Sequence, residues 1–92
     1  MPQILKIGPY LVYFWSNEGE PLEPIHVHIA EGRPTQYATK LWVTKSGKLI
    51  LVNNNSGIPE TILRKMIRML EGNITLIVDK WKEQFGETRY FC

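Results

Sequence analysis

Several residue types and motifs are scarce or missing in this sequence of 92 residues, and each absence narrows the choice of function. The one cysteine, Cys92, cannot form a disulfide within the chain, and a reducing cytoplasm is the expected compartment. The one aspartate, Asp79, leaves little material for a Ser-His-Asp arrangement or a carboxylate-rich metal site. No apolar run approaches the roughly 18 residues that cross a membrane, and no secretory signal begins the chain. We therefore expect a cytoplasmic protein with no membrane segment, no metal site and no cofactor.

The charge is nearly balanced. The chain has 11 Lys and Arg against 9 Asp and Glu, a net charge of +2, which falls short of the basic excess expected of a dedicated nucleic-acid binder. Hydrophobic residues make up 43% of the chain, enough for one small domain over residues 1–92 that folds without metal or disulfides.

The first half of the chain predicts β-strands. Residues 10–16 are rich in aromatic and β-branched side chains; Leu11, Tyr13 and Trp15 would share one face, and Val12 and Phe14 the other. Both faces are apolar, so we expect a helix layer or a partner chain to cover the second. Further strands are expected within residues 3–7, 25–31, 35–44 and 49–53, with a tight turn at 46–48.

The second half predicts two helices, over about residues 58–85. Ser56 or Gly57 is expected to start the first helix, with Pro59 inside its first turn. Its apolar stripe is predicted to contain Ile62, Met66, Ile67 and Leu70, widened by Leu63. Gly72 would end it, Asn73 would cap the second helix, and Gly86 would end that one. The predicted fold class is α+β: an antiparallel β-meander of about four to five strands over residues 3–53, followed by a C-terminal helical hairpin.

The two histidines of the chain, His26 and His28, stand two residues apart in "EPLEPIHVHIAEG". An extended segment places both imidazoles on one face, roughly 6.5–7 Å apart along the chain. There they could act as a general base and a general acid, with Arg33, Lys40 or a helix arginine steadying a phosphate. They could also ligate a metal, but that needs a third ligand, for which Glu23 and Glu31 are the nearest candidates. The third interpretation is structural, with both rings hydrogen-bonded on a partly wet sheet face.

A second group of candidate residues is basic. Lys40, Arg64, Lys65 and Arg68 are the predicted nucleic-acid-binding residues, provided that the fold brings them into one patch. A charged helix face is more often merely solvated. The histidine end is acidic, with Glu18, Glu20, Glu23 and Glu31, and this charge favours a protein partner.

The order and spacing of several segments resemble a family of short bacterial proteins catalogued as a domain of unknown function, number 4160. The matching pieces are Pro24 with His26-Val27-His28, the strand Lys40-Leu41-Trp42, residues 55–59, and Lys80-Trp81 before Phe85-Gly86. Family members commonly carry a proline directly before the first histidine, where this chain has Ile25, so His28 is the safer half of the motif. The resemblance implies a gene neighbour from another small family of unknown function, number 2442, with which a toxin–antitoxin-like module has been proposed. Some members also carry a transcriptional-regulator label.

Three functions from different classes follow. The first is a cytoplasmic bacterial interaction module, one half of a toxin–antitoxin-like pair, which binds a small cognate protein through its sheet edge or aromatic surface. Homodimer formation and nucleic-acid binding through the helix cations remain open alternatives. The second is a small metal-independent ribonuclease with His26 and His28 as the acid–base pair, and a metal-binding regulator is the third. We favour the interaction module over an enzyme.

Overall fold

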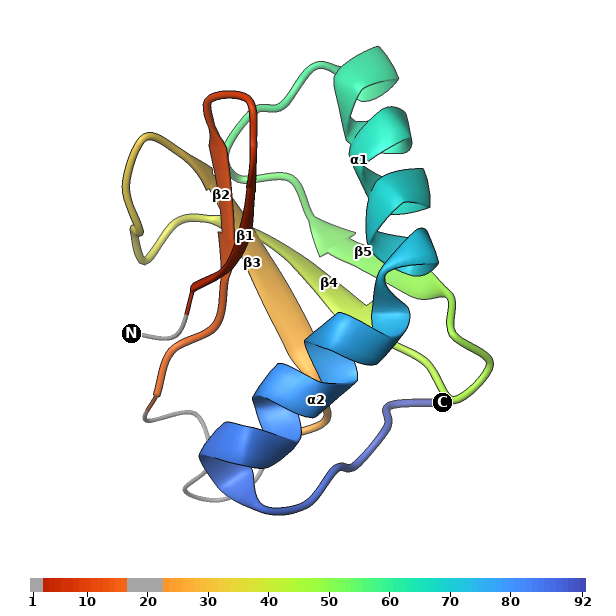
Figure 1. Cartoon of the computed structure of the whole chain (residues 1–92). Coiled ribbons are helices and arrows are strands. Elements are labelled where there is room, and N and C mark those ends of the chain that lie inside the picture. The colour runs from red at the N-terminus through yellow and green to blue at the C-terminus, as the bar shows by residue number, and fades with distance from the viewer. Residues whose placement is uncertain (1–2, 17–22) are drawn as a thin grey trace.

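The computed structural model describes residues 3–16 and 23–92, and the candidate acidic residues Glu18 and Glu20 lie outside them. The elements are β1 (Gln3–Ile7), β2 (Tyr10–Tyr13), β3 (His26–Glu31), β4 (Thr39–Val43), β5 (Leu49–Asn53), α1 (Glu60–Gly72) and α2 (Ile74–Phe85). The strands form one antiparallel sheet of five in the order β1-β2-β3-β4-β5 (Figure 1). The predicted α+β class, a meander followed by two helices, is confirmed.

The strands alternate as their sequence predicts. Val12, Phe14, Val27 and Ile29 join the main core, which lies between the sheet and the helices. Leu11 and Tyr13 point to the opposite face, where they form a smaller buried cluster with Ala30 and Ala38, against which Trp15 packs. We expected a helix layer or a partner chain to cover one face of β2. The two helices form that layer, over the face that carries Val12 and Phe14.

Both helices lie over the same face of the sheet, and α2 turns away from α1 at Asn73 (Figure 1). The helix residues that join the main core include Leu63, Met66, Leu70, Ile77 and Trp81. The expected α1 stripe is wrong at one position, because Ile62 is exposed and Leu63 takes its place in the core. Met66, Ile67 and Leu70 face the core as predicted, so only the first position of the stripe differs.

The start of α1 also differs from the expectation. The helix begins at Glu60 with Pro59 at the N-cap position, not at Ser56 or Gly57. The side chain of Asn54 accepts a hydrogen bond from the Ile58 amide at 3.1 Å and donates one to the Ile58 carbonyl at 2.8 Å. Ser56 Oγ donates to the carbonyl of Ile29 at 2.7 Å and accepts the Thr39 amide at 3.0 Å. These bonds hold residues 54–58 as a turn against β3 and β4, so helical geometry is delayed by about one turn.

The helix ends follow the glycines. Gly86 adopts φ 80° at the end of α2, and its amide donates to the carbonyl of Lys82 at 2.8 Å. Asn73 occupies the N-cap position of α2, but its side chain donates back to the Met69 carbonyl and makes no cap bond to α2. Neither helix in the described part of the chain is long and apolar enough to pass through a membrane.

The residues after α2 run back along the end of the sheet. The Ile25 amide donates to the Arg89 carbonyl at 2.7 Å, and the Lys45 amide donates to the Cys92 carbonyl at 3.0 Å. Phe91 stacks on Trp42, with ring centroids 5.2 Å apart and planes 7° apart. This segment closes the end of the sheet at which β3 begins.

Candidate functional site

The histidine pair has the geometry that its spacing predicts. His26 and His28 lie in β3, and their ring centroids are 4.9 Å apart with the planes at 83°. Val27 between them packs into the main core, so the alternation of the strand turns both imidazoles to the other side of β3. At the start of β3 this side is still reached by α2, because Trp81 of that helix packs against His26.

The two rings have very different surroundings. His26 is completely buried; its Nδ1 lies 3.0 Å from the carbonyl oxygen of Pro24. The rings of Trp42 and Trp81 pack edge-on against it at centroid distances of 5.7 and 5.3 Å. His28 is partly exposed, with its ring 5.6 Å from that of Tyr13. His26 is thus built into the interior, and His28 is the ring that a ligand can reach.

One predicted cation lies beside the histidines. Lys40 stands directly opposite His28 on the neighbouring strand. Its ammonium nitrogen is 3.5 Å from Glu23 Oε1 and 4.4 Å from the centroid of the Trp42 ring. A lysine held over an aromatic face and beside a carboxylate has much of its charge already compensated.

The other predicted cations lie on a different face. Arg64, Lys65 and Arg68 are exposed on α1, whereas Lys40 projects from the sheet face that the helices leave uncovered. Arg33 is exposed in the loop after β3. The fold therefore divides the predicted nucleic-acid-binding residues between two surfaces and leaves three of them together on α1.

The histidine face can support proton transfer through His28 more readily than through His26, because a general acid or base must reach the substrate. Within residues 3–16 and 23–92, no group of three or more His, Cys, Asp or Glu side chains is placed to hold a metal ion. The roles of His26 and His28 stay predictions.

A second surface lies at the edge of the sheet. β5 is the last strand of the meander and, among residues 3–16 and 23–92, it pairs on one side only, with β4. Ile50, Leu51 and Val52 are consecutive in it and are 40%, 43% and 45% exposed. We call residues 49–53 the β5 edge. Their apolar sequence is typical of a buried strand. Their exposure follows from the position of β5 at the end of the meander, and that position is known only from the strand order.

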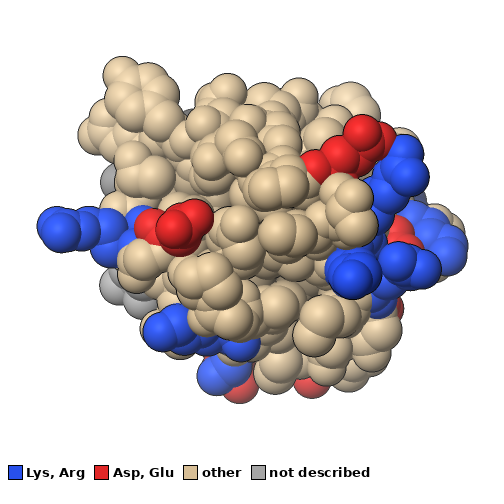
Figure 2. Space-filling model, turned by 90° about the horizontal axis from the view of Figure 1, so that it is seen from above, with Lys and Arg blue, Asp and Glu red and all other residues tan. Residues whose placement is uncertain are grey.

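Helix α1 borders the β5 edge. One carboxylate oxygen of Glu71 accepts the Leu49 amide at 2.9 Å, and the other is 3.9 Å from Lys48 Nζ. Arg64, Ile67 and Arg68 line an open hollow on α1. Figure 2 shows one group of Lys and Arg side chains on the side of the molecule where α1 lies, with acidic side chains next to them, and further Lys and Arg side chains on the opposite side.

The fold and its surfaces define a small α+β protein in which two histidines of β3 pack among aromatic rings, and in which the last strand has an exposed apolar edge. The family model described as Domain of unknown function (DUF4160) matches residues 10–82. The match extends over most of the chain, and the chain belongs to this family. No curated protein and no solved structure gave a match.

Proposed function

We propose that the protein is a cytoplasmic interaction module, one half of a toxin–antitoxin-like pair, and that it binds its partner through the β5 edge. The observation that carries this proposal is the run of exposed apolar residues Ile50, Leu51 and Val52 on a strand with a single neighbour. Such an edge offers backbone donors and acceptors together with apolar surface, and a strand from another protein satisfies both.

The opposite edge of the sheet, formed by β1, has less exposed apolar surface for a partner. In β1, Ile4 is buried, and Leu5 and Ile7 are partly buried against the main core. Because α2 lies against β1, the apolar side chains of β1 are already packed within the chain. The two edges therefore differ, and β5 is the one whose apolar residues gain most from burial, at about 25 cal/mol for each Å² removed from water.

The test identifies the partner protein and then locates its binding surface on the chain. The tagged chain is purified from its native host, the co-purifying protein is identified, and amide hydrogen exchange is compared between the free chain and the complex. We expect slower exchange of the β5 amides in the complex. Unchanged exchange at β5 contradicts the proposed edge, and the absence of any stoichiometric partner contradicts the paired-module function.

A matched pair of variants separates recognition from stability. Leu51→Lys places a charge in the β5 edge, whereas Leu76→Lys makes the same change at a comparably exposed leucine of α2. We expect Leu51→Lys to weaken partner binding at least tenfold and Leu76→Lys to leave it unchanged. Both should alter the free energy of unfolding by about 0.5 kcal/mol or less, because both side chains are substantially exposed.

A second candidate function is a metal-independent ribonuclease centred on His28. The observation in its favour is the direct cross-strand pairing of His28 with Lys40, which sets an imidazole beside a cation. RNA cleavage by the purified protein that is lost in His28→Ala would support it. Intact RNA after incubation over a range of pH values and divalent metals would exclude it.

A further inference from the structure

We infer that the partner segment is an extended acidic strand that alternates carboxylate and apolar side chains, and that Arg64 and Arg68 bind its carboxylates. This inference rests on the proposed function, because it names the chemistry of the partner at the β5 edge. It follows from three features: the direction of the backbone groups of β5, the position of Glu71, and the charge of the neighbouring side of α1.

The backbone of β5 presents hydrogen-bonding groups to the outside at alternate residues. The Val43 amide donates to the Ile25 carbonyl, away from β5, so Val43 and its cross-strand partner Leu49 are not hydrogen-bonded to each other. The Leu49 amide consequently points outward, where it meets Glu71. Leu51 pairs with Leu41 in the same register, two residues further on, and its amide and carbonyl also point outward. A sixth strand can pair there.

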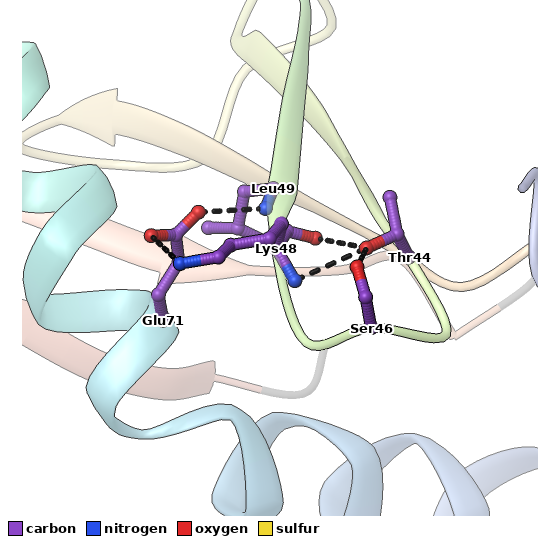
Figure 3. A network of polar contacts seen from close by, with 5 residues as sticks. All are labelled: Thr44, Ser46, Lys48, Leu49 and Glu71. Carbon is purple, nitrogen blue, oxygen red and sulfur yellow. Dashed lines mark hydrogen bonds and ion pairs between the residues drawn. The ribbon is translucent and has the colours of Figure 1, made fainter.

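Glu71 shows that a carboxylate is accommodated at this edge. Figure 3 shows its two oxygens divided between the Leu49 amide and the Lys48 ammonium, next to the turn held by Thr44 and Ser46. In that turn Thr44 Oγ1 donates to the Lys48 carbonyl at 2.9 Å and accepts the Lys48 amide at 3.1 Å. One end of the edge is therefore rigid and already occupied by an acidic group of the chain itself.

The same side of α1 carries positive charge beyond Glu71. Residues three, four and seven positions apart lie on one side of a helix, so Arg68, Ile67 and Arg64 share the side of α1 that carries Glu71, whose carboxylate contacts the Leu49 amide of β5. Arg64 pairs with Glu60, whereas Arg68 makes no ion pair within the described residues. A strand laid on the edge would have this basic row above one of its faces.

The two faces of that added strand meet different surroundings. On the helix side its side chains would extend toward the hollow on α1 that Arg64, Ile67 and Arg68 line. On the other side they meet Ile50, which stands opposite Trp42 on the uncovered sheet face. Because side chains alternate along a strand, the fitting sequence has carboxylates at every second position and apolar residues between them.

The charges argue against two other occupants. A second copy paired through β5 would bring the Arg64 and Arg68 of both copies toward each other, which is repulsive. A nucleic acid would satisfy the arginines but would leave the apolar residues of the β5 edge exposed, and Lys40 is on another face. An acidic protein strand would pair with the backbone of β5, bury its apolar residues and neutralise the arginines.

The experiment uses peptides as probes. A fluorescently labelled nonapeptide alternating Glu and Val, blocked at both ends, is titrated with the full chain, alongside the same peptide with Lys in place of Glu and a single-stranded oligonucleotide of similar length. We expect the Glu peptide to bind at least tenfold more tightly than the Lys peptide, with shifts in the amide NMR signals of β5. We also expect its affinity to fall as the salt concentration rises.

Two double variants locate the charge contribution. Arg64→Gln with Arg68→Gln should weaken the Glu peptide at least tenfold, whereas Lys80→Gln with Lys82→Gln, which removes the same charge from α2, should leave it unchanged. Equal affinity for both peptides, no binding of either, preferred binding of the oligonucleotide, or a β5-paired dimer of the chain at low salt would each overturn the inference. If the captured partner protects β5 but binds the Arg64 and Arg68 variant normally, this inference fails while the proposed function stands.

Discussion

At the scale of single residues, the two histidines differ in what their removal costs. His26 is completely buried among Trp42, Trp81 and His28, so His26→Ala leaves a cavity and should lower the free energy of unfolding by roughly 2–4 kcal/mol. His28 is partly exposed, and His28→Ala should cost less than half as much. Urea denaturation of both variants gives the comparison. Equal losses would show that His26 is not the structural member of the pair.

A second prediction at this scale concerns the turn before α1. Asn54 makes hydrogen bonds to the Ile58 amide, the Ile58 carbonyl and the Thr39 hydroxyl, whereas the neighbouring Asn55 is exposed. Asn54→Ala should therefore lower the free energy of unfolding by roughly 2 kcal/mol, since each such bond contributes about 0.5–1.5 kcal/mol. Asn55→Ala is the control and should change it by about 0.5 kcal/mol or less. Similar denaturation midpoints for the two variants would contradict the assigned network.

At the scale of elements, the two helix-ending glycines should respond oppositely to the same change. Gly86 has φ 80°, where a Cβ is strained, although no atom lies within 4 Å of that position. Gly86→Ala should destabilise the fold by about 1 kcal/mol. Gly72 has no positive φ and also has open space around it, so Gly72→Ala should be neutral or stabilising by up to about 1 kcal/mol. Thermal denaturation distinguishes the two, and a stabilised Gly86→Ala would contradict the cap.

The elements themselves were largely predictable from the sequence, and their exact limits were not. Strand alternation placed His26 and His28 together because the period of two is local information. The start of α1 was misplaced because Ser56, a typical helix-capping residue, bonds to Thr39 and Ile29, which are distant in sequence. Ile62 was placed in the core stripe because the periodicity alone does not specify which neighbouring leucine or isoleucine meets the sheet.

At the scale of the whole molecule, the surfaces depend on strand order, which the sequence does not specify. Lys40 was grouped with Arg64, Lys65 and Arg68 because all are basic, but the sheet separates Lys40 from the helix cations. The sequence predicted binding through a sheet edge or an aromatic surface without specifying which strand forms the edge, and β5 became the candidate once the sheet was seen to end there. The burial of His26 also depends on Trp42 and Trp81, which come from two distant segments.

The last prediction follows from the charge beside the β5 edge. In low salt the free chain should remain a monomer of 10.7 kDa, because self-pairing through β5 brings like charges on α1 together. Raising the salt to about 1 M shortens the screening length to roughly 3 Å and strengthens apolar association, so self-association should increase. Light scattering after size-exclusion chromatography measures the mass. Leu51→Lys should suppress the high-salt association and Leu76→Lys should not; a dimer at low salt that dissociates at high salt would mean that attraction between charges, and not the apolar edge, holds the copies together.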